Sequence, residues 1–313
     1  MAMTKTSTLL RLFIRALLIP VNVDKDGKVV CKILSWRTSL HFIIIVLPTA
    51  TLFVALMLLM PELSMLNFEI GQSSYEIVSN NITFIISNLG ILFPIILGKG
   101  LNNMTHHSLL RNDHSWPKGG WKNIAGKETE LNTIYKIKMR FTAILFLMVG
   151  SAISMQAFMP VKMSMEKVFG SHILMQGVVI FQTIPWIVPP LAVEILLQDF
   201  TNHCENMINV FDHGNDILEG YENMEMSFGT FFLVFYSWVQ VFSIYNTWQL
   251  LMFVFKGNLS FVTIFGLVLM ILSLVLIIVK LANSVSNANN CAKALKKIIQ
   301  DELSYEENKV KSL

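Results

Sequence analysis

Six stretches of the sequence contain no Asp, Glu, Lys or Arg, and the shortest of them is 21 residues long. An α-helix rises about 1.5 Å per residue, so about 20 residues cross the ~30 Å hydrocarbon core of a bilayer. The sequence therefore predicts an all-α polytopic membrane bundle with six spans. The predicted spans are residues 38–61, 77–98, 141–161, 168–193, 226–255 and 257–279.

The overall composition supports a membrane protein. Charged residues make up 14% of the chain, against about 25% in a typical soluble domain, and hydrophobic residues make up 53%. This composition argues against a soluble enzyme, a disordered chain, a disulfide scaffold and a nucleic-acid-binding protein. A porin-like barrel is also excluded, because its strands alternate in polarity and extend over only about 10 residues.

The basic residues predict the orientation. Of the 24 Lys and Arg residues, 21 lie in segments 1–37, 99–140 and 280–313, which six spans would place on one side of the membrane. Basic loops stay in the cytoplasm, so we expect both termini to be cytoplasmic in a multi-pass protein of the plasma membrane. The inner loop 194–225 contains acids and no Lys or Arg, but acids contribute little to orientation.

The amino-terminal segment predicts a helix that lies along the membrane. Within residues 8–20, Leu9 and Phe13 share one helical face and Arg11 and Arg15 share another, which is typical of an interfacial helix. A helix packed on the cytoplasmic face of the bundle is the alternative. No small-residue cleavage site follows, so a cleavable signal peptide is not expected.

The carboxyl-terminal segment 280–313 predicts a cytoplasmic helix and tail. Residues 291–303 place Leu295, Ile298, Ile299 and Leu303 on one face, which predicts an amphipathic helix that continues from the sixth span. Neither an internal repeat nor a Gly/Ser linker is visible, so residues 1–313 are expected to form a single transmembrane domain with cytoplasmic ends.

The sequence shows no pattern for metal binding or catalysis. Cys31, Cys204 and Cys291 fall in predicted cytoplasmic segments, where free thiols are expected. The histidines of the loop 99–140 do not match the ligand spacing of a zinc or di-iron site. With no nucleophile–base pair either, the sequence predicts no metal, no cofactor and no enzymatic activity.

A polar stripe in the fifth span marks the candidate ligand site. Tyr236, Gln240, Ser243 and Thr247 follow one another at i, i+4, i+7 and i+11, and so share one helical face. One interpretation is a pocket wall for a small organic ligand. The other is a seam of interhelical hydrogen bonds with aromatic residues at the outer interface. The predicted ligand-binding residues are Gln240, Ser243, Tyr245, Thr247 and Trp248.

Several features together resemble the arthropod gustatory and odorant receptor superfamily. They are the amphipathic segment LLRLFIRALLIP before the first span, long inner loops with short outer ones, and a sixth span that continues into KLANSVSNANNCAKALKKIIQ. The resemblance implies a chemosensory receptor subunit of a ligand-gated cation channel, with both the amino terminus and the tail inside the cell. It implies a homo- or hetero-tetramer with related subunits, a small organic ligand bound among the outer halves of the helices, and no nucleic acid.

One departure from the family concerns the pore. The family signature, Thr-Tyr followed by an apolar run and Gln-Phe, lies in a seventh helix that lines the pore, and this sequence contains no such motif. The chain is thus expected to be truncated before the pore helix, to come from an incomplete gene model, or to be a divergent six-span relative. Pore residues cannot be transferred to it. The alternative function is a six-span small-solute transporter or membrane scaffold.

Overall fold

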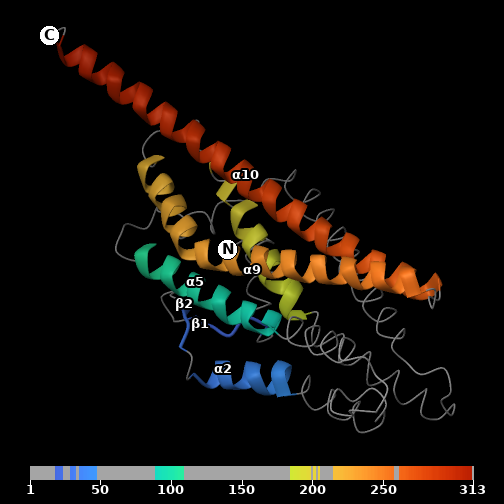
Figure 1. Ribbon diagram of the computed structural model, residues 1–313. Helices are drawn as coiled ribbons and strands as arrows, with labels where there is room; N and C mark the ends of the chain where they lie inside the picture. The colour runs from blue at the N-terminus through green and yellow to red at the C-terminus, as the bar shows by residue number, and fades with distance from the viewer. Residues whose placement is uncertain are drawn as a thin grey trace, which may run out of the picture.

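Helices make up most of the described structure (Figure 1). The computed structural model describes residues 18–23, 29–32, 35–47, 89–108, 184–198, 200–201, 204, 214–256 and 261–311. The helices in chain order are α2 (Trp36–His41), the π-helix η1 (Phe42–Val46), the 3-10 turn η3 (Gly90–Leu92), α5 (Phe93–Ser108), an apolar helix Ile184–Gln198, α9 (Gly214–Lys256) and α10 (Phe261–Lys311).

Two of these helices are long and apolar enough to cross a membrane. They are the segments Leu218–Trp248 of α9 and Ile264–Asp301 of α10, which contain most of the predicted fifth and sixth spans. The described parts of three other predicted spans, residues 38–47, 89–98 and 184–193, are helical. The predicted span 141–161 and most of the predicted interfacial helix 8–20 lie outside the described residues.

Both long helices extend beyond the predicted spans on the side of their charged residues. α9 begins at Gly214, whereas the charge-free stretch begins at residue 226. Glu219, Glu222 and Glu225 lie on this added part of α9. α10 joins the predicted sixth span and the predicted tail helix in one uninterrupted helix, which extends past the other described elements in Figure 1.

A short antiparallel pair of strands was not predicted. β1 (Asn22–Val23) pairs with β2 (Val29–Val30), with Asn22 opposite Val30. This pair lies against α5, where the backbone N–H of Cys31 donates a hydrogen bond to Oδ1 of Asn102 at 3.2 Å. α2 follows directly and is capped by Ser35, whose Oγ accepts from the N–H of Thr38 at 3.2 Å.

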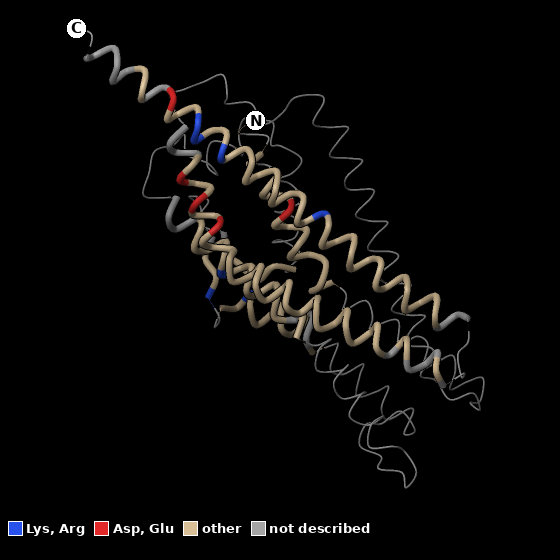
Figure 2. Tube along the Cα trace, turned by 45° about the horizontal axis from the view of Figure 1, so that its top comes forward, with Lys and Arg blue, Asp and Glu red and all other residues tan. Residues whose placement is uncertain are grey.

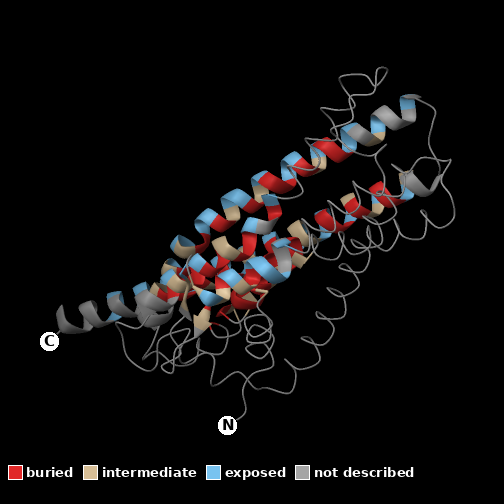
Figure 3. Cartoon of the chain, turned by 90° about the horizontal axis from the view of Figure 1, so that it is seen from below, coloured by how far each residue is buried: buried red, intermediate tan, exposed pale blue. Residues whose placement is uncertain are grey.

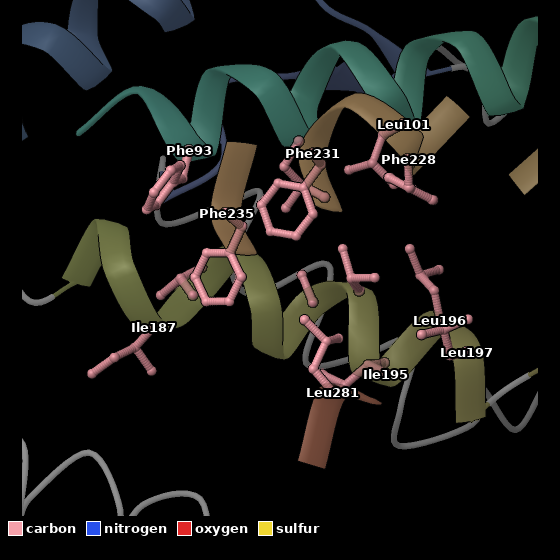
Figure 4. Packing of buried hydrophobic residues seen from close by; sticks show 14 of the residues in the cluster. Phe93, Leu101, Ile187, Ile195, Leu196, Leu197, Phe228, Phe231, Phe235 and Leu281 are labelled. Atoms are coloured by element: carbon pink, nitrogen blue, oxygen red, sulfur yellow. The ribbon is translucent and has the colours of Figure 1, made fainter. Parts of the chain in front are cut away.

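The core forms where α5, α9 and the helix Ile184–Gln198 meet. Figure 4 shows Phe93 of α5, Phe235 of α9 and Ile187 of the apolar helix in the same packed layer. The Phe93 ring meets Phe235 edge-on, with centroids 5.4 Å apart. Edge-to-face pairs of this kind are a favoured aromatic geometry, because the ring edge is positive and the ring face negative.

Glycine allows α5 to approach its neighbours closely. A Cβ placed on Gly100 would lie 2.8 Å from the Phe228 ring and 2.9 Å from the Ser227 carbonyl oxygen of α9. A Cβ on Gly90 would overlap the Trp186 ring. The missing side chain of Gly90 therefore lets η3 pack against the apolar helix, and that of Gly100 lets α5 pack against α9.

Candidate ligand site

Over the lengths predicted to cross a membrane, α9 and α10 carry many large apolar side chains that are exposed. Leu233 and Ile244 are each 70% exposed on α9, and Phe255 is 82% exposed. On α10 the exposed apolar residues are Phe265, Val268, Leu272, Val275, Leu276 and Val279. From Leu233 to Phe255 the helix rises by about 33 Å, close to the ~30 Å of a hydrocarbon core.

The described charges of α9 and α10 lie beyond this apolar length. Figure 2 shows them gathered on one half of the two helices, away from the ends at which α9 stops and α10 starts. On α10 the first charged residue after Phe261 is Lys280. On α9 the last charged residue before the apolar length is Glu225. On both helices the described charges therefore lie on the side away from the connection 257–260.

The inward face of α9 carries a ladder of aromatic side chains. Phe228, Phe231, Phe235, Trp238 and Phe242 recur every three or four residues and are all buried. Figure 3 shows this alternation of buried and exposed residues along both long helices. A three- and four-residue spacing keeps side chains on one face of a helix, so the ladder points into the bundle.

Trp186 connects the apolar helix to the aromatic ladder. Its ring centroid lies 5.2 Å from that of Trp238 and 5.3 Å from that of Phe242. Trp186 falls in the proline-rich segment 184–190, which is helical and buried apart from half-buried Ile184. The ladder thus has α5 on one side, through Phe93, and the apolar helix on another.

The predicted polar stripe lies beside the ladder. Each member of the stripe follows a residue of the buried face by one position, which is a rotation of about 100° around the helix. Tyr236 and Ser243 are half-buried, whereas Gln240 and Thr247 are exposed. The stripe therefore lies at the margin between the packed face and the exposed apolar face of α9.

Two of the five predicted ligand-binding residues come together. Tyr245 is buried, and its ring centroid lies 5.8 Å from that of Trp248, which is about one-third exposed. The two rings are tilted by 47°. Gln240 belongs to the preceding turn and does not share this aromatic pair, so the structure groups Tyr245 and Trp248 and leaves Gln240 apart.

The sequence reasoning did not single out Asn246. Its side chain is only 3% exposed, and its Nδ2 donates to the carbonyl oxygen of Phe242 at 2.6 Å. The stripe was chosen by helical period, and Asn246 falls one position away from it, on the aromatic face. The available signal was a carboxamide in a mainly aromatic and aliphatic run, since a polar side chain is costly in hydrocarbon and so marks a candidate site.

A second buried polar residue lies on α10. Ser273 is 1% exposed and its Oγ donates to the carbonyl oxygen of Leu269 at 2.7 Å. Such bonds to the carbonyl four residues earlier satisfy a hydroxyl within its own helix. Asn246 and Ser273 therefore both bond back to the helix that carries them.

The carboxyl-terminal half of the apolar helix contains a buried carboxylate. Glu194 is 6% exposed, and its Oε1 accepts a hydrogen bond from Nε2 of Gln198 at 3.5 Å. Nearby in the chain, the Phe200 ring stacks on Tyr221 of α9, with centroids 4.8 Å apart. The apolar helix is thus anchored to α9 at this end as well as at Trp186.

All three cysteines are free thiols, as predicted. Cys204 is buried, and Cys31 and Cys291 are half-buried. Burial raises the pKa of the Cys31 thiol, and the positive charge of Lys99 opposes this with a smaller effect. Cys31 is therefore mainly protonated at neutral pH, and its Sγ–H donates to the carbonyl oxygen of Pro20 at 3.8 Å.

Among the described residues, no three His, Cys, Asp or Glu side chains lie close enough together to hold a metal ion. Comparison with known proteins found no matching protein family, no matching characterised protein and no matching solved structure.

Proposed function

We propose that the chain is a multi-pass receptor subunit of the plasma membrane, with both termini in the cytoplasm, that binds a small organic ligand. The proposed class is a chemosensory, gustatory-like receptor of the ligand-gated cation channel superfamily that the sequence resembles. The observation that carries the proposal is the change in the exposed face of α10, from apolar before Lys280 to polar after it, within one uninterrupted helix.

The exposed apolar residues favour lipid as the surrounding medium. Side chains such as Leu233, Ile244 and Phe255 remain largely exposed after the chain has packed its aromatic face. Large exposed apolar patches on a protein mark membrane or protein interaction sites. The charge-free lengths of both helices are long enough to cross the hydrocarbon core, which supports a membrane-spanning arrangement.

The polar extension of α10 supports the receptor class. The resemblance rests in part on a sixth span that continues into a polar cytoplasmic helix. In support, α10 is one helix over Phe261–Lys311 whose apolar length continues into a polar one. The sequence contains no match to the family's pore motif. We therefore propose that this chain contributes ligand recognition within a homo- or hetero-tetramer of related subunits.

The proposed ligand site lies in the outer half of the predicted fifth span. Tyr245 and Trp248 supply adjacent aromatic surfaces, and Ser243, two residues before Tyr245, supplies a half-buried hydroxyl. Ligand pockets are mostly apolar with a few placed polar groups, and these residue types match that chemistry. Gln240 and Thr247 border the same region on the exposed margin.

Topology can be tested with epitope tags on both termini. We expect antibodies to stain each tag only after the plasma membrane is permeabilised, because basic segments stay in the cytoplasm. A tag inserted between residues 257 and 260, in the predicted outer turn, is the matched control and should be stained in intact cells. Staining of either terminal tag in intact cells would contradict the proposed orientation.

Ligand recognition can be tested by co-expression with related channel subunits and screening of small organic compounds for evoked currents. Tyr245→Ala should shift the dose–response to higher concentration without loss of surface expression, because it removes buried aromatic area. Leu233→Ala, on the exposed face of α9, is the control and should leave the response unchanged. Failure of Tyr245→Ala to reach the surface would instead identify a packing residue.

A further inference from the structure

The face of α9 opposite the aromatic ladder carries polar side chains within the charge-free stretch 226–255. Four of them each follow a buried aromatic residue by nine positions: Thr230 after Tyr221, Ser237 after Phe228, Gln240 after Phe231 and Thr247 after Trp238. Nine residues turn an α-helix by about 900°, which is two full turns and a half. These four side chains therefore point away from the packed face, and all four are exposed.

The polar positions belong to a regular pattern of exposed residues. Along α9, exposed residues recur at alternating steps of three and four positions, and we call this set the heptad face: Thr230, Leu233, Ser237, Gln240, Ile244 and Thr247. A mean step of 3.5 residues is the spacing at which one helix stays in contact with another along its length, in the left-handed crossing common in membrane bundles. The heptad face therefore has the geometry of a helix–helix contact.

Gln240 is the member of the heptad face that lipid satisfies least. It is the 15th of the 30 residues in the stretch 226–255, so it lies at the middle of the apolar length. Serine and threonine hydroxyls can bond to a carbonyl oxygen of their own helix, as Ser273 does. A glutamine amide has two N–H donors and an accepting oxygen, and hydrocarbon offers no partner to any of them. The exposure of Gln240 therefore favours a polar protein surface over lipid.

A second copy of the chain carries a surface that matches this one. Copies inserted into one membrane have the same orientation, so their α9 helices run parallel and equal residue numbers lie at equal depth. In a symmetric pair, Gln240 of one copy meets Gln240 of the other, and an N–H of one amide can donate to the oxygen of its partner. The stretch 226–255 contains no charged residue, so like charges do not oppose the contact.

We propose that the heptad face of α9 packs against the same face of a second copy of this chain, with the two Gln240 amides paired at its centre. This inference rests on the membrane-spanning arrangement of the proposed function and does not depend on ligand binding. Ser237 and Thr247 lie on either side of Gln240, and their small side chains let the two helices approach closely. The aromatic ladder on the opposite face stays packed within each copy.

Cross-linking of the full chain in membranes tests the contact and its register. In a background with the three native cysteines changed to serine, Ile244→Cys places a single cysteine on the heptad face and keeps Gln240. Disulfides usually join Cα atoms about 4.4–6.8 Å apart, a separation that equal positions reach at the centre of a close parallel contact. We expect mild oxidation to give a disulfide-linked dimer. Leu272→Cys, exposed on the apolar length of α10, is the matched control and should remain monomeric.

The contribution of the amide is measured by energy transfer between labelled copies in liposomes, as the protein is diluted with lipid. Gln240→Leu should weaken association roughly three- to thirtyfold, the effect of a polar contact between helices in a membrane. Gln240→Asn keeps a carboxamide and should retain part of the association. Leu233→Ala removes apolar area from the same face but no polar group, and should change association less than about twofold, because lipid is as apolar as leucine.

The outcomes separate this inference from the proposed function. No dimer from Ile244→Cys, or equal cross-linking of Ile244→Cys and Leu272→Cys, overturns the contact, while terminal tags that stay cytoplasmic leave the membrane arrangement standing. Unchanged association of Gln240→Leu overturns the pairing of the amides. If Gln240→Leu does not reach the membrane, full association of Gln240→Asn has the same meaning. Staining of a terminal tag in intact cells contradicts the proposed orientation but leaves the α9 helices parallel, so the cross-linking result still decides the contact.

Discussion

The two halves of α10 bury residues at the same three- and four-residue spacing, but the exposed residues are apolar in the first half and polar in the second. In the first half the buried residues include Leu267, Met270 and Leu274, and in the second they include Leu281, Ala288 and Leu295. The exposed residues change at Lys280. Before it they are Phe265, Val268, Leu272, Val275, Leu276 and Val279, and after it they include Asn283, Asn287, Lys293, Lys296 and Lys297.

The difference separates two roles of sequence in one helix. The inward residues determine what the helix packs against, and their three- and four-residue spacing continues across Lys280 without a break. The outward residues determine which medium the helix can occupy, and they change at a single position. A helix that crosses from lipid into water needs such a change on its outer face alone.

The largest expected difference in surface expression comes from placing a positive charge on the apolar half or on the polar half of α10. Leu272→Lys puts an ammonium at the centre of the apolar length, where insertion into a membrane costs about 2.5–3.5 kcal/mol. Asn287→Lys puts the same group on the polar length, where a surface substitution changes stability by about 0.5 kcal/mol or less. We expect only Leu272→Lys to reduce surface expression, measured by biotinylation. Equal expression of the two variants would mean that the first half does not face lipid.

Substitution by a larger side chain tests whether the buried positions in the polar half of α10 are closely packed. Ala288 is fully buried, whereas Ala282 is exposed on the same helix. Ala288→Leu should lower the free energy of unfolding by roughly 1–3 kcal/mol, because the added atoms displace close-packed neighbours. Ala282→Leu should leave it nearly unchanged. Thermal unfolding in detergent would measure both, and similar melting temperatures would show that the second half is not packed.

Gly100 of α5 and Gly229 of α9 allow the same comparison between a packed and an open position. Gly100→Ala forces a Cβ into the Phe228 ring and the Ser227 carbonyl oxygen, and should destabilise the fold by roughly 1–3 kcal/mol. Nothing lies within 4 Å of a Cβ on Gly229, so Gly229→Ala should stabilise the helix by about 0.5–1 kcal/mol. Opposite shifts in melting temperature are expected, and shifts of the same sign would contradict the packing of α5 on α9.

The smallest expected effect is a shift in the pH dependence of labelling at Cys31, which lies beside Lys99. Lys99 directly follows the charge-free stretch 77–98, just as Lys280 directly follows 257–279. In a Cys204→Ser, Cys291→Ser background, maleimide labelling of Cys31 should reach half its maximal rate at higher pH in the folded chain than after unfolding. The reason is that burial raises the thiol pKa, so less thiolate is present at a given pH.

Lys99→Ala removes the opposing positive charge and should move that midpoint to still higher pH. A midpoint in the folded wild type at or below that of the unfolded chain would show that the field of Lys99 exceeds the effect of burial. The same labelling of single-cysteine Cys291 provides a thiol on the polar half of α10 for comparison.

Charge patterning alone predicted part of this fold. The stretches 226–255 and 257–279 lie almost wholly within α9 and α10, and the predicted inward face of residues 291–303 includes Leu295, which is buried. The helix ends were less predictable, because helix formation continues through charged residues such as Glu219 and Glu222. The β1–β2 pair was missed, since two residues per strand are too few to show a period.

For the candidate site, periodicity identified Tyr245 and Trp248 but not Asn246. The stripe was read as the polar face of the span, whereas the structure places Asn246, a buried carboxamide, on the aromatic face. A single sequence does not show which face of an apolar helix meets protein and which meets lipid, because both faces carry similar side chains.

Leu233 and Phe235 illustrate the division between sequence and tertiary structure. Both are large apolar residues in one charge-free stretch, and the sequence determined that each lies in an apolar helical length. The tertiary structure left Leu233 70% exposed and Phe235 1% exposed. Phe235 is buried because Phe93 of α5, more than a hundred residues away in the chain, packs against its ring at 5.4 Å, and no local pattern contains that contact.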